Sequence, residues 1–454
     1  MVAPIIVKKQ IRPFNKKIKV SGDKSLSIRW ALLASQAKGK SKAYNLLKSL
    51  DILSTLNSLK KLGIKVKLRK KYCEIKSNGL NSFKNKKKIT LNAGNSGTFS
   101  RLILGLLIHH KKKIRLIGDK SLSKRDFSRV IFPLRKFGAN FKYTSNYKLP
   151  IEVKGTDKIK PIIYHEKKGS AQCKSAIMLA ALNTNGQTLI RAKKSRNHTE
   201  ILFKYLKIPI SIKRNKKFDL IKIKGKKQFS GFNYNISSDI SSSAFFIVLT
   251  TLSQGSTLTI KNVNINPSRI GIITILKKMG AKISFKNKKT YIGEKVADIF
   301  IKSCKRLNSI NCPTFLNSQA IDEFLLIFLV AAKAKGISYF KDISELNQKE
   351  SPRLKIGSKI LNMMGVKTRL TKSSIKIYGN PELKIDHKIV IKNFMKDHRV
   401  FMMSMIAALS IGGYWKIHDP DSIKSSFPNF LDLIKKLKKH ENNQYTVKNS
   451  QKIK

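Results

Sequence analysis

The chain has 454 residues, of which 41% are hydrophobic, so it is long enough for two large domains and too apolar for general disorder. Its 94 Lys and Arg residues outnumber 25 Asp and Glu residues, and the formal net charge of +69 favours anionic partners without identifying one. The longest strongly apolar run, residues 324–332, is too short to span a bilayer, and the four cysteines have no CxxC or zinc-finger spacing.

Six polar clusters recur along the chain, and each runs directly into an apolar segment that we predict to be a helix. The clusters are rich in Ser, Gly, Asn, Asp or basic residues, and their starts lie between 68 and 81 residues apart. This regular spacing favours a repeated α/β unit over an ordinary alternation of helices and strands. The clusters begin at residues 21, 94, 169, 237, 318 and 396.

A second amphipathic segment in four of the units ends on a glycine and then continues as a strand. Gly just past a helix is the usual left-handed stop, so each pattern predicts a helix, a turn and a strand. The third unit has Ile208-Pro209 instead, and the sixth has a Lys-rich end without Gly. We expect an α/β fold of six units, three in each of two domains. The four stops are Gly63, Gly138, Gly280 and Gly365.

The polar starts of the predicted helices also suggest a chemistry. Free N–H groups and a partial positive charge at a helix N-terminus attract anions, although an ordinary N-cap explains any single cluster better. Cations at this end oppose the helix dipole and cost stability unless an anion binds, so we interpret them as functional. Six such starts facing one another between two domains would form an anion-binding cleft. The cations are Lys24, Arg29, Arg101, Lys174 and Arg399.

An ordered series of motifs identifies a family resemblance. The series reads Gly22-Asp23-Lys24-Ser25-x-Ser27-x-Arg29, Gly94-Asn95-Ser96-Gly97-Thr98-x-x-Arg101, Ser123-Lys124-Arg125, Ser170-Ala171-Gln172-x-Lys174-Ser175, Ser195-Arg196-Asn197-His198-Thr199-Glu200, Ile321-Asp322-Glu323, Lys349-Glu350-Ser351-x-Arg353-Leu354 and Asp397-His398-Arg399. With these motifs in this order, the chain resembles over residues 3–435 the EPSP synthases (3-phosphoshikimate 1-carboxyvinyltransferases), which are enolpyruvyl transferases.

The resemblance implies two similar globular domains, each of three βαβαββ units, with the active site in the cleft between them. The N-terminal domain, residues 20–236, would mainly bind shikimate 3-phosphate. The C-terminal domain, residues 1–19 plus 237–440, would mainly bind phosphoenolpyruvate. The chain would cross between the domains near Val20-Ser21 and near Ile236-Ser237, and residues 441–454 would form a frayed, Lys-rich tail.

The implied reaction transfers the enolpyruvyl group of phosphoenolpyruvate to the 5-hydroxyl of shikimate 3-phosphate and releases phosphate. It runs by addition and elimination through a tetrahedral intermediate, and it makes 5-enolpyruvylshikimate 3-phosphate in the shikimate pathway to chorismate and aromatic amino acids. Neither a metal nor a cofactor is implied. Because residues 1–10 lack the features of a signal peptide, we expect a cytoplasmic protein. We also expect a monomer whose partners are its two small substrates, with no specific nucleic acid and no membrane.

The resemblance also implies a role for individual residues. Asp322 would be the base toward the 5-hydroxyl, Glu350 would donate a proton to the methylene carbon, and Lys24 would assist; the opposite assignment of the two acidic groups stays open. Such a proton donor needs a raised pKa, which closure of the domains together with desolvation would supply. The implied ligands of shikimate 3-phosphate are Lys24, Ser25, Arg29, Ser170, Ala171, Gln172, Arg196, Asp322 and Lys349. Those of phosphoenolpyruvate are Lys24, Gly97, Arg125, Gln172, Arg353 and Arg399.

Departures from the family pattern surround two of these positions. Asn347 and Pro352 replace the Arg and Asp that members often have on either side of Lys349-Glu350. Ser425 stands where some members have Lys, so one phosphoenolpyruvate contact is either absent or supplied by Lys424.

Two other functions are alternatives. The related transferase that acts on UDP-N-acetylglucosamine has Ser-Lys-Asn-Ala at the first motif and a Cys in a mobile loop; this chain has neither, and residues 118–129 contain no Cys. The charge itself suggests nucleic-acid binding. However, the lysines are spread almost evenly without a binding motif, and Lys, Ile and Asn rise together as codon bias in an AT-rich genome would produce.

Overall fold

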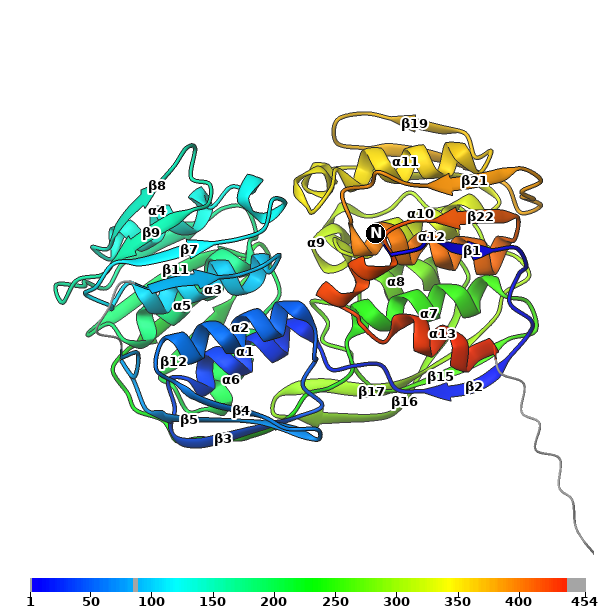
Figure 1. Cartoon of the computed structure of the whole chain (residues 1–454). Helices are drawn as coiled ribbons and strands as arrows, with labels where there is room; N and C mark the ends of the chain where they lie inside the picture. Colours follow the sequence, from blue (N-terminus) through cyan, green and yellow to red (C-terminus); the bar gives the residue numbers. More distant parts are fainter. Residues whose placement is uncertain (1, 85–88, 439–454) are drawn as a thin grey trace, which may run out of the picture.

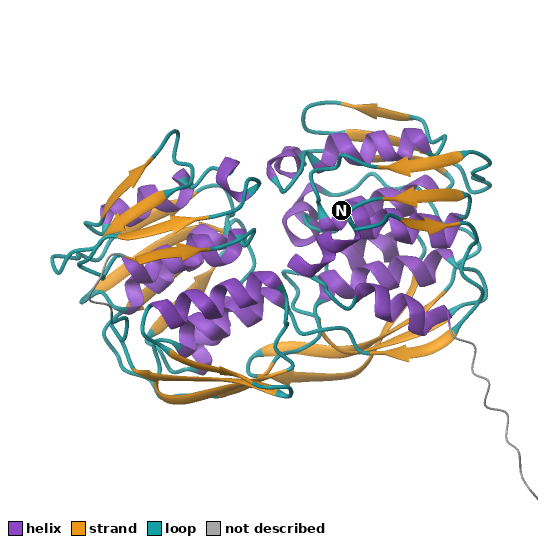
Figure 2. Ribbon diagram, in the orientation of Figure 1, coloured by secondary structure: helices purple, strands orange, loops and turns teal. Residues whose placement is uncertain are grey.

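The computed structural model describes residues 2–84 and 89–438 as a mixed α/β protein of two lobes (Figure 1). The α/β class is therefore confirmed, whereas the predicted tail at residues 441–454 lies outside the described residues. Figure 2 shows helices grouped in the middle of each lobe and strands toward its outside. Within the described ranges, no single helix is long and apolar enough to cross a membrane; one pair bent by 119°, Thr314–Ala320 with Phe324–Ala332, meets that test only when taken together.

The first lobe contains three four-stranded sheets that share one strand order. In each sheet the first two strands are parallel and the remaining pairs are antiparallel. The sheets are β14 (Asn233–Asn235), β3 (Lys38–Tyr44), β5 (Tyr72–Asn78) and β4 (Lys65–Leu68); β6 (Ile89–Asn92), β7 (Ile114–Ile117), β9 (Ile151–Lys154) and β8 (Asn140–Tyr143); and β10 (Ile163–Glu166), β11 (Gln187–Lys193), β13 (Phe218–Lys224) and β12 (Ile210–Arg214).

The second lobe repeats this order with variations. One sheet has four strands in the same parallel and antiparallel pattern, and the other two have three strands each. The sheets are β2 (Asn15–Ile18), β15 (Thr257–Asn264), β17 (Glu294–Lys302) and β16 (Lys282–Tyr291); β18 (Gly336–Phe340), β20 (Ile375–Gly379) and β19 (Thr368–Leu370); and β21 (Lys388–Ile391), β22 (Tyr414–Ile417) and β1 (Ile5–Val7).

Two strands connect the lobes, because each precedes a helix of one lobe and pairs with a strand of the other. Strand β2 comes before α1 in the chain but pairs with β15, and β14 comes before α7 but pairs with β3. The two crossing segments also bond to each other: the N–H of Asp23 donates to the carbonyl of Ser237 over 2.9 Å, and that of Asp239 donates to the carbonyl of Ser21 over 3.0 Å.

Six helices begin at the six predicted starts. All are apolar on most sides and largely buried, as expected for helices surrounded by other elements. They are α1 (Lys24–Ala34), α3 (Gly97–Leu107), α5 (Ala171–Leu182), α7 (Ile240–Leu252), α10 (Phe324–Ala332) and α12 (His398–Ile411). Buried apolar residues form two clusters, one running from Leu26 to Ile236 and the other combining Val7–Val20 with Ile240–Leu437.

The second helix of each unit is more amphipathic. These helices are α2 (Leu50–Lys61), α4 (Ser128–Lys136), α6 (His198–Tyr205), α8 (Gly271–Lys278), α11 (Arg353–Met363) and α13 (Phe430–Lys438). The four predicted glycine stops follow α2, α4, α8 and α11 with φ between +81° and +111°, a left-handed conformation that glycine adopts without strain. Short helical turns complete the fold: α9 (Asn317–Ala320), η1 (Leu122–Lys124), η2 (Thr314–Leu316), η3 (Ser344–Gln348) and η4 (Pro420–Ser425).

His109, just beyond the end of α3, gives the fold a testable pH dependence. Its Nε2 lies 2.8 Å from the carbonyl oxygen of Ala180, and burial lowers the pKa of the imidazole from 6.5 to about 4. The unfolded chain therefore takes up a proton that the folded protein does not, and stability falls as the pH drops from 6.5 toward 4. For His109→Gln we expect this slope to be smaller by up to about 1.4 kcal/mol per pH unit. Urea unfolding at several pH values measures it, and an unchanged slope would contradict the prediction.

Candidate active site

Several of the predicted site residues lie at helix N-termini of both lobes, where side chains cap several of the helices. Lys24 is the first residue of α1, Gly97 of α3, Ala171 of α5 and Arg353 of α11, and Arg399 is the second residue of α12. Asp23, Ser96, Ser170 and Asp397 cap α1, α3, α5 and α12 by accepting from backbone N–H groups. The remaining free N–H groups and the cations beside them make these helix ends attractive to anions.

Two ion pairs join predicted residues of the two lobes. Arg196, in the loop before α6, places Nη2 2.7 Å from Oδ2 of Asp322. Arg125, just after η1, places Nη2 3.3 Å from Oε1 of Glu350. The structure therefore brings Arg196 and Arg125 of the first lobe against Asp322 and Glu350 of the second.

Glu350 lies between two arginines, bonded to Arg353 of its own lobe and to Arg125 of the other. Burial alone would raise the pKa of this carboxyl, but Arg353 and Arg125, with His398 and Lys24 farther away, hold it well below its usual range. In the protein without substrate, the pKa of Glu350 therefore lies below its usual range, and the raised pKa expected on closure stays a prediction. The pKa is low because attraction to two guanidinium groups outweighs the loss of hydration.

Asp322 has a similar environment. Besides Arg196, its carboxylate lies 3.5 Å from Nζ of Lys349 and 4.0 Å from Nη1 of Arg353, and its backbone carbonyl accepts from Arg399 over 2.7 Å. Burial would raise the pKa of Asp322, but these cations hold it well below its usual range. Asp322 is thus a carboxylate at neutral pH, as a base must be, but one that is engaged by cations.

Two acidic residues outside the predicted set hold its cations in place. Asp51, in the first turn of α2, lies 3.0 Å from Nζ of Lys24, and burial raises the pKa of Asp51 against the opposing effect of that lysine. Asp397 accepts from both Nε and Nη2 of Arg353, over 2.8 and 3.2 Å, in a paired geometry that fixes the guanidinium plane. Sequence reasoning named Asp397 only as part of a motif, and no spacing rule connects Asp51 to Lys24.

Two of the cations that we interpreted as functional have internal partners instead. Lys174 is fully buried with Nζ 2.5 Å from Oε1 of Glu200. Arg101 donates to the carbonyl oxygens of Gly97 and Asp126 and lies over the ring of Phe127. Since a carboxylate, carbonyls and an aromatic face contact these cations, their position near a helix N-terminus is explained without a bound anion.

The other predicted ligands lie beside these helix starts. Arg29 is buried and donates to Thr199 over 2.8 Å, to Ser175 over 3.0 Å and to the carbonyl of Ser25 over 3.2 Å. Gln172 donates to Thr98 over 3.1 Å, which joins the starts of α5 and α3. These contacts orient Arg29 and Gln172 before any ligand arrives.

The absence of a side chain at Gly97 leaves space for two arginines, Arg101 and Arg125. A Cβ at this position would lie 2.9 Å from Nη1 of Arg101 and 2.9 Å from Nη1 of Arg125. Glycine therefore lets both guanidinium groups reach the start of α3.

The positions that depart from the family pattern have local partners. Pro352 precedes the first residue of α11, and Asn347 accepts from the backbone N–H of Lys355 over 3.4 Å. Ser425 lies 3.3 Å from Nδ1 of His398, and burial lowers the pKa of His398 to about 3. Lys424 is exposed.

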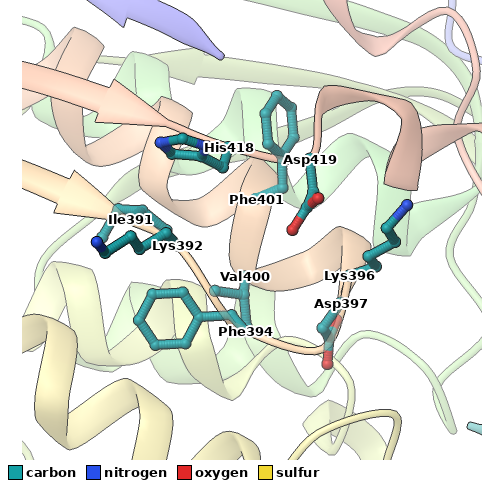
Figure 3. Close-up of a pocket in the computed structure, with 9 residues that line it drawn as sticks. All are labelled: Ile391, Lys392, Phe394, Lys396, Asp397, Val400, Phe401, His418 and Asp419. Carbon is teal, nitrogen blue, oxygen red and sulfur yellow. The ribbon is translucent and has the colours of Figure 1, made fainter. Parts of the chain in front are cut away.

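Two small hollows lie near the start of α12. One, of about 260 Å³, is lined by Lys24 of the first lobe and by Asp239, His398 and Arg399 of the second, so it belongs to the predicted site. The other, of about 210 Å³, lies between the ends of β21 and β22 and the start of α12 (Figure 3). Its lining includes Asp397, which pairs with Arg353. Among the residues that the structure describes, no group of three or more His, Cys, Asp and Glu side chains is placed to hold a metal ion.

Comparison with known proteins identifies the fold class and then the family. The enolpyruvyl transferase NikO from Streptomyces tendae shares the fold with a TM-score of 0.75 at 12% sequence identity, over 96% of this chain and 97% of that one. This likeness places the chain in the enolpyruvyl transferase fold class. The family model for EPSP synthase (3-phosphoshikimate 1-carboxyvinyltransferase) matches residues 8–434, and the chain belongs to the EPSP synthase family.

Individual relatives agree with this assignment, which confirms the family prediction. A 3-phosphoshikimate 1-carboxyvinyltransferase of Ruthia magnifica subsp. Calyptogena magnifica is 40% identical over 421 residues, 92% of this chain and 94% of that protein. One from Petrotoga mobilis is 36% identical over 428 residues, 93% of this chain and 97% of that protein. The solved structure of an EPSP synthase from Acinetobacter baumannii has a TM-score of 0.83 at 32% identity, over 96% of this chain and 98% of that one.

Proposed function

We propose that this chain transfers the enolpyruvyl group of phosphoenolpyruvate to the 5-hydroxyl of shikimate 3-phosphate and releases phosphate, which is the reaction of its family. It thereby makes 5-enolpyruvylshikimate 3-phosphate in the shikimate pathway to aromatic amino acids. One observation carries the assignment of roles: each of two partly buried carboxylates between the lobes is paired with an arginine from the opposite lobe, Asp322 with Arg196 and Glu350 with Arg125.

The cations divide between the two substrates. In our proposal Arg196 binds the phosphate of shikimate 3-phosphate, together with the Ser170 hydroxyl, the N–H of Ala171 and Gln172. Ser25, Arg29 and Lys349 bind its remaining polar groups. Phosphoenolpyruvate lies at the start of α3, held by Lys24, Gln172, Arg125, Arg353 and Arg399, because planar guanidinium groups pair well with phosphate and carboxylate oxygens.

Substrate binding changes the two carboxylates. When the anions of phosphoenolpyruvate engage Arg125 and Arg353, those cations stabilise the ionised form of Glu350 less, and its pKa rises into the range of a useful acid. When the phosphate of shikimate 3-phosphate engages Arg196, the carboxylate of Asp322 becomes available to the 5-hydroxyl. The substrates themselves thus prepare the acid and the base.

The bond changes then balance in two steps. Asp322 accepts the 5-hydroxyl proton as the oxygen bonds to the central carbon of phosphoenolpyruvate, while Glu350 donates a proton to the methylene carbon. In the second step Glu350 takes a proton back from the resulting methyl group, the carbon–carbon double bond reforms, and the phosphate leaves with the bonding electron pair. The proton held by Asp322 leaves with the phosphate or to solvent, and Lys24 stabilises the departing charge.

Phosphate release from phosphoenolpyruvate tests this function. Purified protein receives phosphoenolpyruvate with shikimate 3-phosphate, with UDP-N-acetylglucosamine, or alone, and mass spectrometry identifies the product. We expect release only with shikimate 3-phosphate, in equal amount to 5-enolpyruvylshikimate 3-phosphate. Release with UDP-N-acetylglucosamine instead, or with neither acceptor, would overturn the proposal.

We also propose that the two domains move and that the chain acts alone. Residues 20–236, and residues 1–19 with 237–440, act as two domains that close over the substrates, and the enzyme acts as a cytoplasmic monomer. Closure excludes water and strengthens the electrostatic contacts in the cleft. Small-angle X-ray scattering should give a monomer mass and a smaller radius of gyration when both substrates are added; a dimer mass or an unchanged radius would count against it.

A further inference from the structure

A buried arginine outside the proposed reaction joins the segments that carry the site. Arg269 lies just before α8 in the second lobe, and its side chain is only 3% exposed. The guanidinium donates to Ser241 over 2.9 Å and lies 3.3 Å from Asp23, 3.5 Å from Asp239 and 3.4 Å from Nε2 of His198. One side chain therefore contacts both crossing segments and the start of α6.

Each of these contacts leads to a residue of the proposed site. Asp23 caps α1 directly before Lys24, and Asp239 accepts from the backbone N–H of Lys24 over 3.3 Å. Ser241 donates to Oε1 of Glu323 over 2.5 Å, and Glu323 directly follows Asp322.

His198 extends the network to the loop that carries Arg196. An arginine can only donate, so Nε2 of His198 accepts from Arg269, and Nδ1–H donates to Oε1 of the buried Glu294 over 2.6 Å. The other carboxylate oxygen of Glu294 accepts from Asn266 over 2.9 Å, and Asn266 also donates to Asn197 over 2.8 Å. Groups of the second lobe thus hold residues 197 and 198 of the first.

The long hairpin β16–β17 delivers Glu294 to this place. Figure 1 shows the hairpin running beneath the gap toward the first lobe. At its tip the Tyr291 hydroxyl accepts from the backbone N–H of Asn235 over 2.9 Å, and Ile292 packs against the core of that lobe. The network around Arg269 therefore lies where the two lobes are joined, below the proposed cleft.

We infer that Arg269 is a positioning residue, which fixes Lys24, Arg196 and Asp322 relative to one another. It does so by binding the caps of α1 and α7 (Asp23 and Asp239) together with Ser241 and His198. This inference rests on the proposed function. Buried ion pairs add little stability compared with apolar groups of the same size, so a role in orientation explains better than a role in stability why the chain buries this network. A lysine cannot replace the fork of an arginine that contacts several acceptors at once.

The test compares Arg269→Lys with the unchanged chain and with Arg135→Lys. Arg135, on α4 of the first lobe, is an exposed arginine outside the proposed site; it donates to the carbonyl of Phe141 and lies over the ring of Tyr143. For Arg269→Lys we expect both KM and the calorimetric Kd for shikimate 3-phosphate to rise about tenfold, the loss of roughly one charge-assisted hydrogen bond. Arg135→Lys should match the unchanged chain. A purely stabilising role would lower the amount of active protein and leave KM and Kd unchanged, which would overturn the inference.

A second variant covers the case in which Arg269→Lys does not fold. Ser241→Ala removes only the hydroxyl between Arg269 and Glu323, and we expect it to raise KM for shikimate 3-phosphate about threefold. If the unchanged chain releases phosphate, and Ser241→Ala has the same KM and Kd for shikimate 3-phosphate as the unchanged chain, the inference is wrong although the proposed function holds. If the unchanged chain neither releases phosphate nor binds shikimate 3-phosphate, the proposed function fails and the inference with it.

Discussion

Glu350→Gln is expected to lower kcat about a thousandfold without raising KM for phosphoenolpyruvate, since general acid–base catalysis contributes about 10²–10⁴ in rate. Glutamine keeps the size of the side chain and one acceptor oxygen but cannot exchange a proton with the methylene carbon. It also removes the negative charge between Arg353 and Arg125. With no carboxylate competing for these arginines, the phosphoenolpyruvate anion should bind as well as before or more tightly.

The matched control for this prediction is Glu345→Gln. Glu345 also forms an ion pair between the lobes, 3.8 Å from Arg129, and lies 3.9 Å from Nζ of Lys349, but it is half exposed and takes no part in the proposed proton transfers. Its loss should change kcat less than about threefold, as is usual for an exposed ion pair. Steady-state kinetics with phosphoenolpyruvate varied distinguish the two effects. Unchanged turnover in Glu350→Gln would remove Glu350 from the chemistry, and an equal fall in both variants would mean that the ion pairs matter only for closure.

The positions of the helices were predictable because the signals are local. A polar cluster followed by an apolar run specifies a start, as at Lys24 of α1 and His398 of α12, and a glycine such as Gly365 specifies a stop. The ordered motifs also identified the family. Information of this kind lies within about ten residues of the position that it describes, so it survives without a structure.

The charge state of the site was not predictable, because it depends on contacts between distant segments. Arg196 and Asp322 are 126 residues apart in sequence and meet only through the packing of the lobes. Desolvation of Glu350 was predictable from the sequence, but not the two arginines whose attraction lowers its pKa in the protein without substrate. In the same way, sequence reasoning assigned Lys174 to an anion, although Glu200 on α6 already pairs with it.

Asp322→Asn is expected to lower kcat about a thousandfold while shikimate 3-phosphate binds at least as tightly as before. Asparagine cannot accept the 5-hydroxyl proton, so the addition step loses its base. The carboxylate of Asp322 also occupies Arg196 at 2.7 Å in the absence of substrate, where we place the substrate phosphate. Removing that charge removes a competitor for Arg196, and the free energy now used to separate the ion pair becomes available for binding.

Calorimetry with shikimate 3-phosphate alone separates this prediction from a loss of structure. Asp157→Asn is the matched control, because Asp157 forms an exposed ion pair with Lys111 at 3.0 Å on the surface of the first lobe. That variant should keep both the Kd and the kcat of the unchanged chain. If Asp322→Asn bound shikimate 3-phosphate much more weakly, Asp322 would be a ligand that holds the substrate rather than a base that Arg196 restrains until the phosphate arrives. The ion pair between Asp322 and Arg196 would then be part of the binding site itself. The proposal that the substrate phosphate frees Asp322 from Arg196 would be wrong.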